Sequence, residues 1–421
     1  MKIINFENIK EKIYYEKLDN GMEVYLYPTN KSKNFYASIS TKYGSSTTSY
    51  KKGEENISVY PGTAHFLEHK VMNFTTNKEY FERMNELGSA CNAYTTYNVT
   101  NYNIFGSGNV NENLNLLFDM VMNPGINEEN VESEKGIICE EIDMDKDDVI
   151  TNLYIKRNQN LFHKLYPINH ILGEKEDINK INSSYLKMIY KDFYKPSNMF
   201  IIVVGSFILE DVLEFIKSYM KKVKNKTEEK IKIKKIKEPD KVKVEYEIVK
   251  KEVSEDKVYY SSKINKKIFK GLSDYELSYY LRIILSSNFA ATSPLYEKYK
   301  MSNLITTLKS EFKIFDNHLI LTIKASTPNS EKFISNLKKD IKNLNIDENT
   351  FIRKKRKILS ETILTFENIE DVEFLITNSI LTHKKLYNKD YDLIKNLDYK
   401  IINDIIKKIN FDNSSLLICT R

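Results

Sequence analysis

A Lys-rich, polar stretch at residues 221–250 interrupts the chain near its middle, and the segments on either side each have the length of a globular domain. A chain of 421 residues exceeds what one hydrophobic core usually supports. We therefore predict an N-terminal domain at 1–222, a Lys/Glu-rich linker at 223–250 and a C-terminal domain at 251–421. Acidic residues interrupt the basic run and no aromatic residue lies within 221–240. A solvated linker leading into an edge strand is therefore favoured over a nucleic-acid or membrane contact.

Short alternating segments and longer segments with helical periodicity follow one another in both domains. In the N-terminal domain, strands are expected within 13–28, 34–43, 89–105 and 199–204, and helices at 78–88, 111–123, 127–147, 150–163, 183–192 and 208–222. In the C-terminal domain, strands are expected near 242–263, 303–311, 316–325 and 415–420, and helices near 272–299, 330–343, 348–368, 370–384 and 398–408. This order predicts an α+β fold with helices packed on a mostly antiparallel sheet in each domain.

Residues 61–76 contain the pattern His-x-x-Glu-His, formed by His65, Glu68 and His69. On an α-helix these side chains share one face, since each residue turns the chain by about 100°. Two imidazoles at this spacing can bind one zinc ion, and the carboxylate beside them can take a proton from water that the ion activates. The pattern is the inverse of the commoner His-Glu-x-x-His motif. Buried histidines often belong to a hydrogen-bonded core instead, but this spacing is rare by chance in a chain with six histidines.

A catalytic zinc ion usually takes three protein ligands, so a further donor is needed. The helical segment 131–144 carries Glu134 and Glu141 seven residues apart, which places both on one face. Glu140 points about 100° away from Glu141. We assign Glu141 as the third ligand and Glu134 as a carboxylate that orients a histidine. By itself, an acidic helix of this kind is usually a solvated surface.

Four segments in this order resemble the inverted-motif zinc peptidases of the pitrilysin/insulinase family, in particular the short bacterial members related to the mitochondrial processing peptidase. The segments are 63–69 (TAHFLEH), 88–96 (GSACNAYTT), 134–144 (EKGIICEEIDM) and 193–205 (FYKPSNMFIIVVG). In that family the third zinc ligand is a Glu in a Glu-x₆-Glu pair, which Glu134 and Glu141 match.

The resemblance implies a zinc-dependent endopeptidase with one Zn²⁺ per chain. It also implies two related domains that face each other as a clamshell around a peptide. Asn92, Ala93 and Tyr94 fall where the family has an edge strand to which the substrate adds as a further strand. From the residues alone, an ordinary hairpin strand is the simpler interpretation of this segment.

One departure from the family concerns an Arg that precedes a Tyr by seven residues in the C-terminal domain and grips the substrate. The corresponding stretch, 294–307, offers Lys300 and the pair Thr306 and Thr307 instead. Lysine lacks the planar fork of arginine, and threonine is too short to replace a tyrosine hydroxyl. We therefore expect this chain to be the metal-bearing subunit of a heterodimer whose related partner supplies the Arg/Tyr pair, with a homodimer as the other arrangement. A catalytically vestigial peptide-binding or scaffold subunit is the alternative function, although this chain keeps the whole zinc motif.

Charge and cysteine content bear on the compartment. The 64 basic and 58 acidic residues leave a net charge of +6 that is dispersed, so no nucleic-acid partner is expected. Cys91, Cys139 and Cys419 are too few and too scattered for a disulfide framework. The N-terminus has no apolar signal segment, and no run approaches 18 apolar residues. These features predict a cytoplasmic protein without a membrane partner.

Overall fold

The computed structural model describes residues 1–73, 77–223 and 229–421. The centre of the expected linker, 224–228, lies outside the described residues. The chain forms two compact units, and both are discontinuous in sequence. Unit 1 comprises Met1–Asp145, Asn169–Lys235 and Thr362–Lys389, and unit 2 comprises Lys146–Ile168, Ile236–Glu361 and Asp390–Arg421.

Unit 1 is built on a seven-stranded sheet whose central strand is wholly buried. In sheet order the strands are β1 (Lys2–Phe6), β2 (Glu11–Lys17), β3 (Glu23–Pro28), β9 (Met199–Gly205), β4 (Phe35–Thr41), β8 (Thr100–Gly106) and β7 (Ala90–Thr95). All neighbours are antiparallel except β3 and β9. A small second sheet has the order β10 (Ile231–Ile233), β5 (Ser49–Lys52) and β6 (Glu55–Ser58). The mostly antiparallel sheet expected from the sequence is confirmed.

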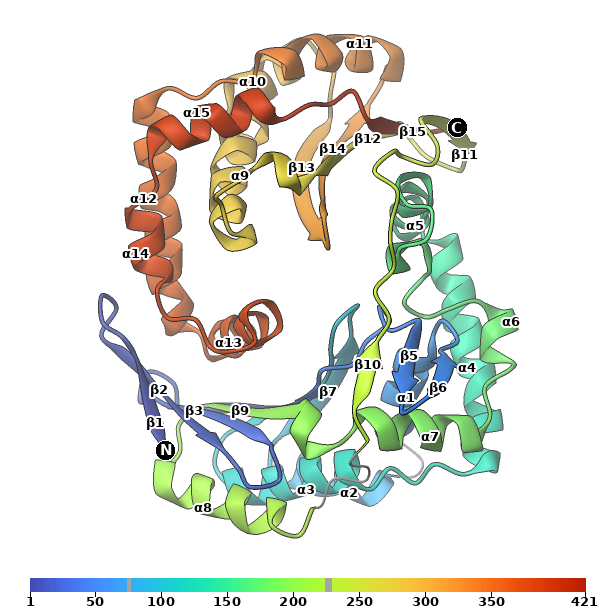
Figure 1. Ribbon diagram of the computed structural model, residues 1–421, viewed down its shortest axis with the longest axis vertical. Coiled ribbons are helices and arrows are strands. Elements are labelled where there is room, and N and C mark those ends of the chain that lie inside the picture. Colours follow the sequence, from blue (N-terminus) through green and yellow to red (C-terminus); the bar gives the residue numbers. More distant parts are fainter. Residues whose placement is uncertain (74–76, 224–228) are drawn as a thin grey trace. The chain divides into compact units, whose positions relative to one another are not determined.

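Helices cover both faces of this sheet (Figure 1). One apolar cluster joins one sheet face to helices α3 and α8, and another joins the opposite face to α13. The helices of unit 1 are α1 (Thr63–Val71), α2 (Lys78–Glu86), α3 (Val110–Met122), α4 (Glu128–Asp147), α6 (Lys175–Ile178), α7 (Ser183–Phe193), α8 (Leu209–Met220) and α13 (Ile369–His383). The last two residues of α4 fall in unit 2.

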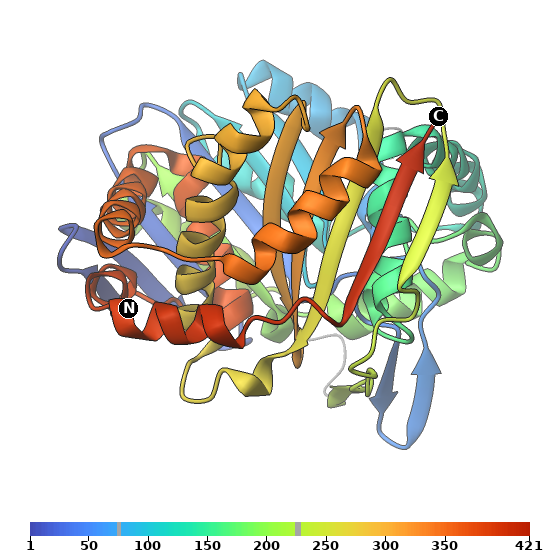
Figure 2. The ribbon, with the colours of Figure 1, turned by 90° about the horizontal axis from the view of Figure 1, so that it is seen from above.

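Unit 2 has a five-stranded sheet with helices across it, seen from above in Figure 2. The strand order is β11 (Tyr246–Lys250), β15 (Ser414–Thr420), β12 (Asp256–Asn265), β14 (His318–Thr327) and β13 (Thr307–Phe315). The helices are α5 (Val149–Leu161), α9 (Asp274–Phe289), α10 (Pro294–Met301), α11 (Ser330–Asp340), α12 (Glu348–Leu364), α14 (Asp390–Lys395) and α15 (Tyr399–Lys408). Strand β11, at the end of the basic run, is an edge strand of this sheet, as expected. Within the run, however, β10 pairs with β5, so this part of the expected linker belongs to a sheet.

The two units are copies of one topology. Numbered along the chain, strands β3, β4, β7, β8 and β9 lie in the sheet order 1-5-2-4-3, and strands β11 to β15 lie in the same order. In both sheets the first and last strands are parallel and the other neighbours are antiparallel. The family resemblance implied two related domains, and this shared order demonstrates the relation.

Two equivalent helices are exchanged between the halves of the chain. Helix α5 follows the fourth strand of the first copy but belongs to unit 2, where Leu153 packs with Tyr259 and Leu417. Helix α13 follows the fourth strand of the second copy but belongs to unit 1, where Val372 packs with Phe200. The packing units therefore differ from the predicted domains 1–222 and 251–421. The reason is that each sheet has a second apolar face, and a helix from the other half covers it.

Among the described residues, no helix combines the length and the apolar character that crossing a bilayer requires.

Candidate metal centre

The motif helix α1 starts at a close backbone contact. Gly62 precedes the helix with φ of 85°, and a Cβ there would lie 2.3 Å from the Leu172 carbonyl oxygen. Gly173 approaches from the other side, where a Cβ would lie 2.5 Å from the Pro61 carbonyl oxygen. Only glycine can occupy either position without a shift of the backbone. These contacts hold the loop after residue 168 against the start of the helix that carries His65.

His65, His69 and Glu141 converge as the sequence predicted. Each offers one ligand atom, and these atoms lie within 4.8 Å of one another. Glu141 Oε2 is 3.6 Å from His65 Nε2 and 3.4 Å from His69 Nε2. Ligand atoms on a tetrahedral zinc ion would be about 3.3 Å apart, given bonds of about 2.0–2.1 Å. The donor types therefore suit zinc, and the distances from Glu141 Oε2 to the two histidine nitrogens are close to that spacing.

The two histidines do not form an ordinary hydrogen-bonded core pair. His65 is buried, and its Nδ1 atom has no hydrogen-bond partner among the described residues. Burial and the neighbouring His69 lower the pKa of His65 to about 4, which keeps the imidazole neutral, as a metal ligand must be. Burial also disfavours charge on His69, but contacts with Glu134 and Glu141 outweigh it and raise the pKa of His69 to about 9. The carboxylates of Glu134 and Glu141 thus favour a positive charge at His69.

Glu134 contacts a histidine of the motif, as the sequence analysis expected. Its Oε1 atom lies 3.1 Å from His69 Nδ1, and its Oε2 atom accepts hydrogen bonds from Lys70 Nζ at 3.1 Å and Asn73 Nδ2 at 2.8 Å. Burial opposes ionisation, but these three contacts outweigh it and lower the pKa of Glu134 to about 2. A carboxylate at Nδ1 fixes the tautomer that leaves Nε2 of His69 free for a metal ion.

Glu68, the expected general base, is held from the neighbouring strand. The Thr95 hydroxyl, at the end of β7, donates a hydrogen bond to Glu68 Oε2. Burial raises the pKa of Glu68, while the bond from Thr95 lowers it. Glu68 thus sits between the histidine pair on its own helix and the strand expected to bind substrate.

The predicted substrate strand lies at the open edge of the sheet of unit 1. Strand β7 pairs with β8 on one side and is the last strand of the sheet (Figure 1). Asn92 is exposed, and its Oδ1 atom accepts the backbone N–H of Ala93 at 2.8 Å. Tyr94 packs against the apolar cluster of Val99 and Phe200. The edge can therefore accept an added strand.

Sequence reasoning missed four residues around this centre. Lys70 and Asn73 bind Glu134, Thr95 binds Glu68, and His170 Nε2 lies 3.1 Å from Asp145 Oδ2. The hydrogen bond from His69 chiefly lowers the pKa of Glu141, and the charge of His170 adds to the effect. Asn73 lies two residues beyond the end of α1, so helical spacing did not indicate it. The others lacked a local signal.

The stretch 294–307, in which the sequence offers Lys300, Thr306 and Thr307 instead of an Arg/Tyr pair, spans α10 and the first residue of β13. Lys300 Nζ donates to the Thr306 carbonyl oxygen at 3.4 Å. The Thr306 hydroxyl donates to Glu255 Oε1 at 2.6 Å. Thr307 is the first residue of β13 and is exposed.

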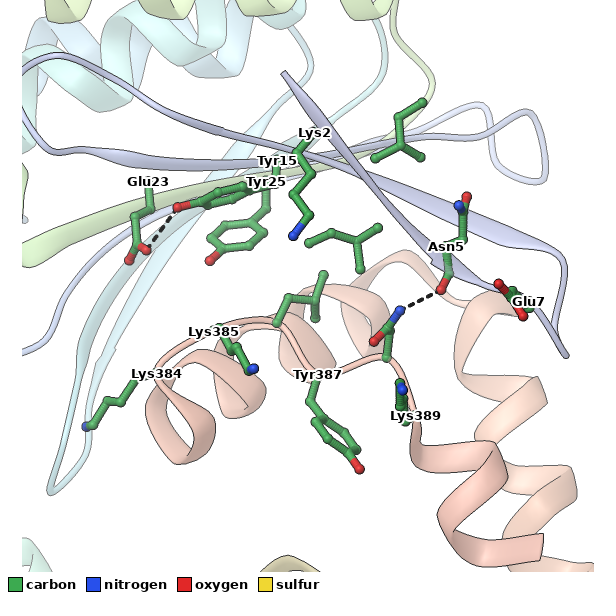
Figure 3. Close-up of a pocket in the computed structure, with 14 residues that line it drawn as sticks. Lys2, Asn5, Glu7, Tyr15, Glu23, Tyr25, Lys384, Lys385, Tyr387 and Lys389 are labelled. Carbon is green, nitrogen blue, oxygen red and sulfur yellow. Dashed lines mark hydrogen bonds between the residues drawn. The ribbon is translucent and has the colours of Figure 1, made fainter.

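A separate cavity of about 640 Å³ in unit 1 has no connection to this chemistry. Strands β1 to β3 and residues 384–389 line it, and none of the motif residues does (Figure 3). Tyr387 points away from the strands in this view. The metal centre remains the candidate functional site.

Comparisons with known proteins show the family of this chain. The family model described as insulinase (peptidase family M16) matches residues 54–166, and the model described as peptidase M16 inactive domain matches residues 180–357. The chain is 31% identical over 343 residues to a Bacillus subtilis protein described as uncharacterized zinc protease YmfH, covering 80% of this chain and 79% of that protein.

Two crystal structures show the same fold. A putative M16-like peptidase from Alicyclobacillus acidocaldarius superposes with a TM-score of 0.89 at 21% identity and covers 97% of each chain. The periplasmic protease PqqL from Escherichia coli superposes with a TM-score of 0.79 at 17% identity, over 97% of this chain but 47% of that one. The resemblance stated from four short motifs is thereby confirmed over most of the sequence, and the chain belongs to peptidase family M16, the insulinase family.

Proposed function

We propose that this chain is a zinc-dependent endopeptidase that cleaves unstructured peptides. The observation that carries this proposal is the convergence of His65, His69 and Glu141 beside Glu68. Relatives named as zinc proteases support it. If Glu68 were absent from the site, or if Glu141 lay far from the two histidines, the scaffold alternative would be favoured instead.

In this proposal each residue has one task. His65, His69 and Glu141 hold zinc, which when bound supplies Lewis acidity to water and to the peptide carbonyl. Glu68 accepts a proton from the attacking water and passes it to the leaving amine as the C–N bond breaks. Thr95 keeps Glu68 directed toward the reaction, and Glu134 keeps His69 in the correct tautomer.

The substrate class follows from the edge strand. Backbone groups at the free edge of β7 hold any extended segment, so sequence matters less than an unfolded conformation. A peptide added there runs past Thr95 toward Glu68. Folded proteins, whose strands are already paired, do not offer such a segment.

We further propose that the chain is the metal-bearing subunit of a dimer. In a heterodimer a related partner supplies the Arg/Tyr pair; the other arrangement is a homodimer. Lys300 and Thr306 in place of these residues support the pairing. The match to PqqL agrees with a dimer. This chain covers 47% of the PqqL chain, so PqqL is long enough to contain two copies of the two-unit fold. The cytoplasmic location stays a prediction, which fractionation of the native source would test.

Glu68→Gln tests the function. The wild-type protein should bind close to one zinc ion per chain and cleave unstructured peptides, alone or with its co-purifying partner. The Glu68→Gln variant should retain zinc and lose turnover by several orders of magnitude. Zinc analysis and mass spectrometry of peptide products measure both. Wild-type protein without zinc, or a Glu68→Gln variant with normal turnover, would contradict the proposal.

A further inference from the structure

Lys70 is an unusual side chain for its position. It directly follows His69 on α1, yet it is only 1% exposed. A buried lysine is costly unless its charge is balanced by a partner. Its Nζ atom donates to the Asn130 carbonyl oxygen at 2.6 Å and to Glu134 Oε2 at 3.1 Å. Both acceptors lie in the first two turns of α4, the helix that carries Glu141.

The two oxygens of Glu134 are used differently. Oε2 receives Lys70 and Asn73, whereas Oε1 faces His69 Nδ1. With Oε2 occupied by an ammonium group and an amide, the carboxylate cannot rotate to present another oxygen without losing charge-assisted bonds. The orientation of His69 therefore depends on the contacts that Lys70 and Asn73 make with Glu134, although neither residue touches the ligand atoms.

We propose that Lys70 is a positioning residue for the metal centre, acting through Glu134. Its buried positive charge balances the Glu134 carboxylate and holds it at the angle at which Oε1 meets His69. Because α4 carries both Glu134 and Glu141, the same contact fixes the carboxylate ligand relative to the histidine pair. This inference rests on the zinc site of the proposed function.

Lys70→Met tests the inference, since methionine is apolar and nearly as long as lysine. The expected result is a zinc affinity lower by about 10- to 100-fold, the usual effect of losing a contact that orients a ligand. Zinc affinity is measured by competition with a chelating dye, independently of peptide cleavage. The matched control is Lys263→Met in unit 2. Lys263 is also 1% exposed and pairs with a buried carboxylate, Glu238, at 2.7 Å. That variant should lose thermal stability and keep wild-type zinc affinity.

A double-mutant cycle separates positioning from a general loss of stability. Glu134→Gln should weaken zinc binding by itself. If Lys70 acts through Glu134, adding Lys70→Met to Glu134→Gln should change the affinity by less than about threefold. If Lys70→Met alone fails to fold, the comparison of the double variant with Glu134→Gln still tests the inference. The double variant is expected to fold because it buries no unbalanced carboxylate.

The outcomes are distinguishable. Wild-type affinity in Lys70→Met, or a double variant whose loss equals the product of both single losses, would overturn the role of Lys70. Wild-type protein that binds no zinc would overturn the proposed function itself, a different result from the same titration.

Discussion

Glu134 and Glu141 contact opposite nitrogens of one imidazole ring. Glu134 Oε1 lies 3.1 Å from His69 Nδ1, and Glu141 Oε2 lies 3.4 Å from His69 Nε2. The two carboxylates, which are two turns apart on α4, thus contact the His69 ring of α1 at its two nitrogens. One of them fixes the ring, and the other joins the ring's free nitrogen in the donor set. The spacing of the two acids is therefore a requirement of the site.

Glu141→Gln should abolish tight zinc binding, because the neutral amide is a much weaker ligand than a carboxylate. The matched control is Glu140→Gln, which removes an exposed acid next to it on the same helix and should bind zinc as the wild type does. Metal content after dialysis measures the difference. Equal zinc loss in both variants would show that Glu141 acts only through the general charge of α4.

Thr95→Val should reduce turnover by about tenfold or more and leave zinc content unchanged, since it removes the hydroxyl that holds Glu68 but keeps the shape of the side chain. Thr95→Ser keeps a hydroxyl and should recover most of the activity. Steady-state kinetics on one peptide, with zinc analysis of each variant, tests this. Full activity in Thr95→Val would mean that Glu68 needs no such support.

Ala93→Pro should raise KM while changing thermal stability little. The N–H of Ala93 is bonded to the Asn92 side chain, so it faces away from β8 and belongs to the free edge of β7. Proline removes that donor, which an added peptide strand would use. The control is Tyr94→Pro at the next position. The N–H of Tyr94 points toward β8, so this substitution should destabilise the sheet. An unchanged KM in Ala93→Pro would argue against strand addition at β7.

Gly62→Ala should destabilise unit 1 by about 2 kcal/mol or more, because its Cβ would meet the Leu172 carbonyl oxygen at a left-handed backbone position. Gly136→Ala is the opposite case. A Cβ at Gly136 in α4 meets nothing within 4 Å, so alanine should stabilise the helix by up to about 1 kcal/mol. Thermal unfolding of both variants measures the difference in sign.

Asp390→Asn should remove a pH-dependent loss of stability. Burial raises the pKa of Asp390 to about 7, and Tyr279 donates a hydrogen bond to it at 2.7 Å. The folded state therefore holds this proton between about pH 4 and pH 7 while the unfolded state releases it, and stability falls as pH rises through that window. The variant and the wild type should unfold at similar temperatures near pH 4. At pH 8 the variant should be more stable by about 1–3 kcal/mol.

Much of the metal centre could be predicted because its parts are local. The spacing of His65, Glu68 and His69 on one helix, and of Glu134 and Glu141 on another, follows from the helical period alone. Thr95 and His170 could not be predicted in this way. They reach the site through a strand and a loop whose positions depend on packing between distant segments.

The same distinction holds for the fold. Alternation and helical periodicity predicted most strands and helices, but missed β1, β5, β6 and β10, which are only three to five residues long. The repeated element order and the zinc motif were determined by the sequence itself, because both depend on neighbouring residues. Only the tertiary structure decided which half of the chain α5 and α13 pack against. Those choices depend on which apolar surfaces match across hundreds of residues, and no local pattern records them.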